Sequence, residues 1–196
     1  MSTASLRKNG NPEKLVLSAC IESWVQQYMA EGVSAEIPDW DRERSQRFWE
    51  PDRKLLLAIR RYQHWRVRGG LIPRLVCKWF VVCHRFWSVV TGAEISLNCD
   101  IGGGLLLPHP NGIVIHPAAK IGVNCLIFQQ VTIGTRGGND APVIGGHVDI
   151  GAGAKILGSV RIGAHARIGA NAVVLTDVPD GAIAIGIPAK VVEIRR

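Results

Sequence analysis

The sequence lacks the features that mark several common classes of protein. Its five cysteines contain no CxxC pair, and their odd number does not suit a framework of disulfides. The longest apolar stretch, residues 71–90, is interrupted by charged residues, so we expect no helix that crosses a bilayer. The first 14 residues are polar, and we expect no signal peptide. These features together predict a cytoplasmic protein with reduced thiols.

Signatures of nucleotide and metal sites are also missing. The sequence has no P-loop and no GxGxxG followed by a helix, and no pair of its six histidines has the spacing of metal ligands. The net charge is +7, with much of the excess before residue 90, but no nucleic-acid recognition motif accompanies it. A solvated helical face explains this charge, and attraction to acidic lipid head groups or to an anionic substrate are the alternatives.

What the sequence does contain is an aliphatic residue at every sixth position near its C-terminus. A period of six fits neither a helix nor a simple strand. It fits a coil with three flat faces of six residues each, in which glycine and alanine leave room at the corners. The pattern therefore predicts a mainly β protein, a parallel β-helix. The repeating residues are Ile144, Ile150, Ile156, Ile162, Ile168 and Val174.

The same register continues upstream, with two interruptions. Ile95, Ile101 and Leu107 are six apart, and Ile115, Ile121, Ile127 and Ile133 resume after a slip of two. The slip holds the sequence Pro-His-Pro-Asn-Gly at 108–112, and the second break covers residues 134–143. Interruptions cost a repeat its regularity, so functional residues are expected there.

The first 92 residues are expected to be an α-helical region before a β-helix domain at 93–196. Helices are predicted over residues 12–31, 39–49, 51–69 and 73–90, the last closed by Thr91 and Gly92. The helix over 73–90 is expected to cover the open edge of the first coil, and peripheral contact with a membrane, at its inner surface, is the alternative.

Several segments carry a resemblance to a known family. Gly-Ile-Val-Ile at 112–115, Gly-Ala-Gly-Ala-Lys-Ile-Leu-Gly at 151–158, Ile-Gly-Ala-Asn-Ala-Val-Val at 168–174 and Gly-Ile-Pro-Ala-Lys at 186–190 resemble serine O-acetyltransferases of the hexapeptide-repeat superfamily. The resemblance covers about residues 55–192. It implies a left-handed β-helix, a homotrimer with a hexamer as the alternative, and acetyl-CoA bound as co-substrate between neighbouring coils, without a metal.

The resemblance also implies roles for individual residues. His109 matches the catalytic base, and Glu94 matches the acid that orients it. A general base is needed because an alcohol alone is a poor nucleophile, and a carboxylate on the other ring nitrogen fixes the tautomer of the imidazole. The residues implied to contact acetyl-CoA are Gly134, Ala152, Arg167, Ala170 and Lys190, and those near the acceptor are Asn111, Arg136 and Asp140.

Departures from the family pattern bear on the acceptor. Asp140 and Ala141 stand where serine acetyltransferases have the arginine and histidine that grip the amino acid, and Pro108 stands where they have an acid. A carboxylate is bound best by a bidentate arginine. The sequence-based hypothesis is therefore acetyl transfer to a sugar hydroxyl of a polysaccharide precursor, with serine O-acetylation for cysteine synthesis as the alternative. A non-catalytic scaffold would not need His109 and Glu94 together, and an enzyme resembling carbonic anhydrase would need a histidine–metal cluster.

Overall fold

The computed structural model describes residues 32–138 and 140–192. The chain divides into two units, residues 1–33 and 34–196, and everything below concerns the described residues of the second. The helix expected over residues 12–31 lies outside the described residues.

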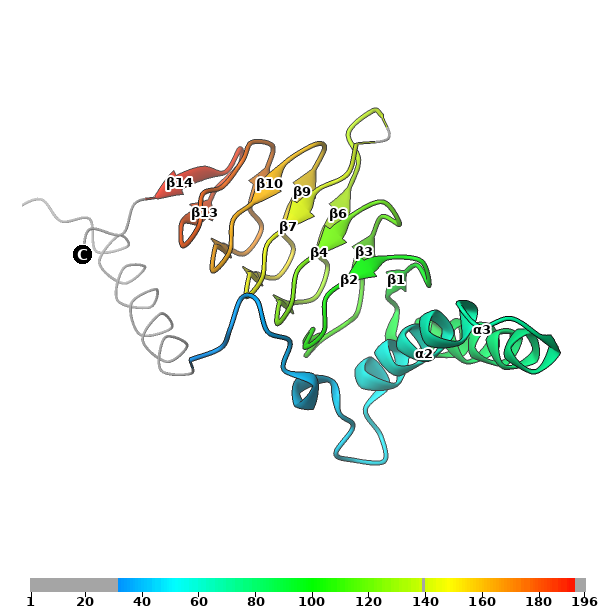
Figure 1. Cartoon of the computed structure of the whole chain (residues 1–196). Helices are drawn as coiled ribbons and strands as arrows, with labels where there is room; N and C mark the ends of the chain where they lie inside the picture. The colour runs from blue at the N-terminus through cyan, green and yellow to red at the C-terminus, as the bar shows by residue number, and fades with distance from the viewer. Residues whose placement is uncertain (1–31, 139, 193–196) are drawn as a thin grey trace, which may run out of the picture. The chain divides into compact units, whose positions relative to one another are not determined.

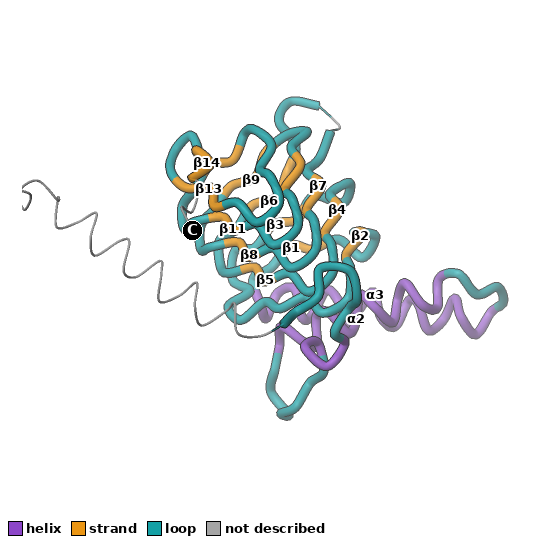
Figure 2. The backbone as a smooth tube through the Cα atoms, turned by 60° about the vertical axis from the view of Figure 1, so that its left-hand side comes forward, coloured by secondary structure: helices purple, strands orange, loops and turns teal. Residues whose placement is uncertain are grey.

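From Glu94 onward the chain winds into a parallel β-helix with three flat faces (Figures 1 and 2). Sheet A contains β1 (Glu94–Ile95), β3 (Val114–Ile115), β6 (Thr132–Gly134), β9 (Lys155–Leu157) and β12 (Val173–Val174). Sheet B contains β2 (Asp100–Ile101), β4 (Lys120–Ile121), β7 (Val143–Ile144) and β10 (Arg161–Ile162). Sheet C contains β5 (Leu126–Ile127), β8 (Asp149–Ile150), β11 (Arg167–Ile168), β13 (Ile183–Ile185) and β14 (Lys190–Val192). All these strands pair in parallel except β13 with β14, which closes the coil antiparallel.

Aliphatic side chains at the sixfold positions point into the coil and stack from turn to turn. The column inside sheet A is Ile95, Ile115, Ile133, Ile156 and Val174, each at most 2% exposed. Burying each such side chain contributes about 1.5–3 kcal/mol, before the entropy cost of ordering the chain. The predicted parallel β-helix and its register are confirmed.

Two cysteines take the place of small apolar residues inside the coil. Cys99 and Cys125 are both buried, and burial raises the pKa of the Cys125 thiol to about 12. A thiol with so high a pKa is protonated and unreactive at neutral pH. All four cysteines within the described residues are free.

The helical region contains a hairpin of α2 (Pro51–Arg66) and α3 (Leu71–Thr91). α2 begins with a proline in its first turn, and α3 ends at Gly92 in the left-handed region with φ of 66°, as the sequence predicted. The helix predicted over residues 39–49 is wrong, because only η1 (Trp40–Glu43), one turn of 3₁₀-helix, forms there. The Glu50 carboxylate instead gathers Ser45 Oγ and the N–H groups of residues 46 and 47 into a turn.

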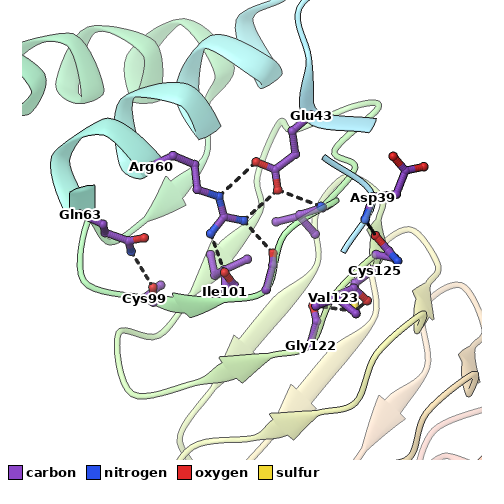
Figure 3. A network of polar contacts seen from close by, with 12 residues as sticks. Asp39, Glu43, Arg60, Gln63, Cys99, Ile101, Gly122, Val123 and Cys125 are labelled. Atoms are coloured by element: carbon purple, nitrogen blue, oxygen red, sulfur yellow. Dashed lines mark hydrogen bonds and ion pairs between the residues drawn. The ribbon is translucent and has the colours of Figure 1, made fainter. Parts of the chain in front are cut away.

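α2, more than α3, covers the open edge of the first coil, which corrects the sequence-based assignment (Figure 3). Four of its residues are buried: Leu55, Leu56, Ala58 and Ile59. Arg60 donates to the carbonyl oxygens of Ile101 at 2.5 Å and Gly102 at 2.7 Å, and it is paired with Glu43 at 2.8 Å. Gln63 donates to the carbonyl of Cys99 at 2.9 Å. These bonds satisfy backbone groups that an uncovered sheet edge would leave open.

A segment before the hairpin is tied to the coil by one buried asparagine. Asn124 is fully buried and has a φ of 59°. Its Oδ1 accepts from the N–H of Asp39 at 2.8 Å, and its Nδ2 donates to the carbonyls of Ser34 at 2.7 Å and Ile37 at 2.8 Å. Asparagine tolerates this backbone region better than most residues, and here its amide also holds residues 34–39 against the corner.

We therefore expect Asn124→Ala to lower the free energy of unfolding by about 3 kcal/mol, because it leaves buried polar groups of the backbone unpaired. Residues 34–39 should also become sensitive to limited proteolysis. The matched control is Asn171→Ala, since Asn171 has a similar φ of 56° but an exposed side chain. Urea denaturation of both variants gives the comparison, and equal losses of stability would show that the three hydrogen bonds do not matter.

Candidate active site

The predicted site residues gather mainly at the two edges of sheet A. One edge is the turn from sheet C into sheet A, which we call the His109 corner; it contains residues 108–112, 129–130, 152–153 and 170–171. The other is the turn from sheet A into sheet B at residues 134–142, which we call the Arg136 loop. Between them lies the outer face of sheet A, formed by Glu94, Val114, Thr132, Lys155 and Val173.

His109 lies in the interruption of the repeat that precedes β3. The loop is held from both sides, because Gly112 N–H donates to the Gly92 carbonyl at 2.8 Å and the Asn111 carbonyl accepts from Gln130 N–H at 2.9 Å. The side chains of His109 and Asn111 are exposed. An exposed imidazole on a backbone fixed in this way is available to a bound hydroxyl compound.

Glu94 lies beside this corner, at the start of β1. Its N–H donates to the Ile113 carbonyl at 2.8 Å, and it pairs in register with Val114, so its exposed side chain is on the outer face of sheet A. Within the described residues, the side chains of Glu94 and His109 make no hydrogen bond with each other. The predicted acid and base are thus brought to one edge of one sheet, while the bond between them is not formed in the single chain.

Two of the residues expected to lie along acetyl-CoA stack at the His109 corner. Ala152 and Ala170 are one turn apart, and the Ala152 carbonyl accepts from Asn171 N–H at 2.8 Å. Above them, Ala189 N–H donates to the Val173 carbonyl at 2.8 Å, which brings the exposed Lys190 near the end of the same edge. Because the side chains of Ala152 and Ala170 are small, they leave the backbone accessible along this edge of sheet A, from His109 toward Lys190.

The Arg136 loop holds Gly134, Arg136 and Asp140 at the opposite edge of sheet A. Gly134 ends β6, and its carbonyl accepts from Gly158 N–H at 2.9 Å. The side chains of Arg136 and Asp140 are exposed, and Arg136 is the sole lysine or arginine in the sequence of residues 134–142. The structure therefore separates the predicted acceptor residues: Asn111 lies at one edge, and Arg136 and Asp140 lie at the other.

Arg167 is not grouped with the corner residues. It lies in β11 of sheet C, its side chain is 11% exposed, and its Nε is 3.9 Å from Asp149 Oδ2. Burial raises the pKa of the Asp149 carboxyl, and the guanidinium of Arg167 opposes this rise. The structure therefore places Arg167 on sheet C beside Asp149, and its contact with the phosphates of acetyl-CoA stays a prediction.

The other coil histidines lie away from the His109 corner. His147 and His165 stack at the turn between sheets B and C, with 2.8 Å between their Nδ1 atoms. Burial and the neighbouring His165 lower the pKa of His147. His116 follows β3, and its Nδ1 accepts from the Ala118 N–H at 3.2 Å. Within residues 32–138 and 140–192, no three histidine, cysteine, aspartate or glutamate side chains are grouped as metal ligands.

Sequence reasoning missed Lys155, which stands on the outer face of sheet A between the two edges. Its Nζ donates to the Gln130 carbonyl at 2.6 Å, so its ammonium group reaches the His109 corner. The signal was present in the repeat: Lys155 directly precedes the inward Ile156, and a residue in that place faces outward. This lysine adds a fixed positive charge close to the residues expected to act on the substrate.

The chain is similar to several known proteins. Residues 141–176 match the family described as bacterial transferase hexapeptide (six repeats). The serine acetyltransferase of Synechococcus elongatus is 39% identical over 141 residues, in an alignment that covers 69% of this chain and 55% of that protein. The apoenzyme of soybean serine acetyltransferase has 37% identity and a TM-score of 0.60, covering 70% of this chain and 56% of that one. A serine acetyltransferase in complex with CoA has 32% identity and a TM-score of 0.62, covering 74% and 58%. The chain spans little more than half the length of these proteins.

Proposed function

We propose that this hexapeptide-repeat protein is an acetyl-CoA-dependent O-acetyltransferase of the serine acetyltransferase family, and that L-serine is its acceptor. The observation that carries the proposal is the His109 corner: an exposed imidazole on a fixed loop, an acid on the adjacent strand, and a rim of small residues ending near Lys190. The similarity to serine acetyltransferases over 69% of the chain supports the same reaction.

The chemistry follows from the residues at this corner. His109 would remove the proton of the acceptor hydroxyl while the acceptor oxygen bonds to the carbonyl carbon of the acetyl thioester. As the carbon–sulfur bond breaks, the imidazolium would return that proton to the departing thiolate sulfur. Glu94 would hold the other ring nitrogen and stabilise the imidazolium. Acetyl-CoA supplies the acetyl group as its thioester.

A trimer is part of this proposal. His109 and Arg136 lie at opposite edges of sheet A, and both side chains are open to solvent in the single chain. Two coils packed side by side would bring the His109 corner of one copy toward the Arg136 loop of the next and enclose the substrates. Exclusion of water strengthens the electrostatic interactions in such a site.

The sequence-based preference for a sugar acceptor is not supported by the comparisons, because the relatives named above are all serine acetyltransferases. One observation keeps it as a second candidate. Asp140 is exposed and Ala141 packs against the coil, so neither supplies a cation for the carboxylate of an amino acid. Under the serine proposal, Arg136 is the guanidinium within this loop that takes that role.

The acceptor is tested by measuring the release of CoA thiol with L-serine and with a panel of sugars. We expect turnover of serine, and we expect Arg136→Ala to raise the KM for serine at least about tenfold with a smaller change in kcat, since a charged hydrogen bond is lost on binding. The control is Arg161→Ala, because Arg161 is also an exposed arginine but lies on β10. This variant should leave both constants unchanged. Turnover of a sugar with none of serine would reject serine and establish the second candidate.

A further inference from the structure

The helix α3 carries an apolar stripe that nothing within the described residues covers. The exposed fractions of its members run from 56% for Phe86 to 84% for Val89. An apolar stripe of this length that is open to solvent marks a surface that meets another apolar phase. The members of the stripe are Leu71, Ile72, Leu75, Trp79, Val82, Phe86 and Val89.

The stripe is continuous along the whole helix. From Ile72 to Val89 its members follow one another at alternating steps of three and four residues, which places them on one face. The opposite face is already used: it packs on α2, and His84 bonds to the Ile95 carbonyl of the first coil at 2.7 Å. Figures 1 and 2 show α2 and α3 lying side by side, with the turn between them pointing away from the coil. The helix is about 31 Å long at 1.5 Å per residue.

The charge around this stripe is of one sign. No aspartate or glutamate occurs between Asp52 and Glu94, whereas six basic residues lie from 61 to 85: Arg61, Arg66, Arg68, Arg74, Lys78 and Arg85. All six are exposed. On α3, each basic residue directly precedes a stripe residue, as Lys78 precedes Trp79 and Arg85 precedes Phe86. The cations therefore form a row along one margin of the apolar stripe.

We propose that the α2–α3 hairpin binds an anionic lipid surface, with the stripe of α3 lying in the plane of the interface. The stripe would enter the boundary between head groups and acyl chains, and the row of cations beside it would reach acidic head groups. Trp79 and Phe86 are residue types suited to this depth. No helix within the described part of the chain is long and apolar enough to cross a bilayer.

The basic residues beside the stripe favour an anionic lipid surface, and not a second copy of the hairpin, as the binding partner. α3 contains no acidic residue, so another α3 packed against the stripe would offer no partner for Arg74, Lys78 or Arg85. An anionic bilayer offers apolar and negatively charged groups together. The inference does not depend on the proposed acetyl transfer, because none of these residues belongs to the candidate active site.

The test is flotation of the full chain with vesicles of phosphatidylglycerol and phosphatidylcholine, or of phosphatidylcholine alone. We expect binding to the anionic vesicles, weakened by salt, and little binding to the neutral ones. Lys78→Glu/Arg85→Glu should weaken the partition coefficient by about thirtyfold or more, at about fivefold for each basic residue lost at the surface. Trp79→Gln/Phe86→Gln should weaken it at least about tenfold.

Two matched controls accompany these variants. Arg44→Glu/Arg47→Glu makes the same change in net charge on exposed residues outside the hairpin, and Phe48→Gln removes an aromatic side chain that is 93% exposed. Both should bind as the unaltered chain does. Failure of the unaltered chain to bind anionic vesicles would overturn the proposal. If light scattering then showed a smaller assembly for Trp79→Gln/Phe86→Gln, the stripe would be an interface between copies.

Discussion

Replacing His109 with alanine should lower the rate of acetyl transfer by about two to four orders of magnitude while the coil stays folded. The acceptor hydroxyl holds its proton tightly at neutral pH. Removal of the base therefore raises the energy of the transition state and has little effect on the affinity for the substrates. We therefore expect the loss in kcat, with the KM values for both substrates little changed. The loop itself should keep its place, because backbone bonds of Gly112 and Asn111 hold it and the His109 side chain is exposed.

The measurement is steady-state release of CoA thiol, with circular dichroism and thermal unfolding as the check on the fold. His116→Ala is the matched control, since His116 is the next imidazole along the chain but stands after β3, with its Nδ1 bonded to Ala118 N–H. That variant should retain activity within a few fold. Full activity of His109→Ala, or a large loss confined to His116→Ala, would contradict the assignment of the base.

Much of the coil was predictable because its repeat is local. Each short strand places one aliphatic residue inside the coil. The sixfold spacing of Ile150, Ile156 and Ile162 therefore predicts how the turns pair and which neighbouring side chains point outward. The site followed in part, because the interruptions at 108–112 and 134–143 stand out against the repeat. Lys155 was missed although its outward position follows from the same register.

The parts that depend on contacts distant in sequence were not predictable. The polar sequence of residues 39–49 predicts a short helix. In the structure, Asp39 instead bonds to Asn124 of the coil, 85 residues away, and Glu43 bonds to Arg60 of α2, 17 residues away. Tertiary bonds override a weak local preference for helix. The more apolar helix, α3, was expected to cover the first coil, and α2 does so through Leu55 and Ile59. Hydrophobicity alone does not say which surface a helix meets.

The largest expected effect on stability comes from Gly122→Ala, which should lower the free energy of unfolding by about 3 kcal/mol or more. Gly122 turns the corner after β4, directly against the next turn of the coil. A Cβ atom at this position would lie 2.5 Å from the Gly145 carbonyl carbon and 2.5 Å from Gly146 N, closer than any unstrained contact. These are backbone atoms, so no side-chain rotation relieves the overlap.

The strain cannot be absorbed at one turn, because the same crowding recurs along this corner. A Cβ on Gly102 would lie 2.6 Å from the Gly122 carbonyl carbon, and one on Gly145 would lie 2.7 Å from Ala164 N. Neighbouring turns are held at the spacing of paired strands, about 4.8 Å, and any widening breaks ladder bonds such as Gly122 N–H to the Ile144 carbonyl at 2.8 Å.

Gly69→Ala is the matched control for this substitution. Gly69 lies in the turn between α2 and α3, and a Cβ there meets nothing within 4 Å. The same change should therefore be neutral or stabilise the protein by up to about 1 kcal/mol, through the smaller entropy of the unfolded chain. Urea denaturation of the two variants separates steric overlap from the general effect of replacing glycine. Equal stabilities would mean that the turns can spread, and that the glycines at this corner are not required by close approach of the backbone.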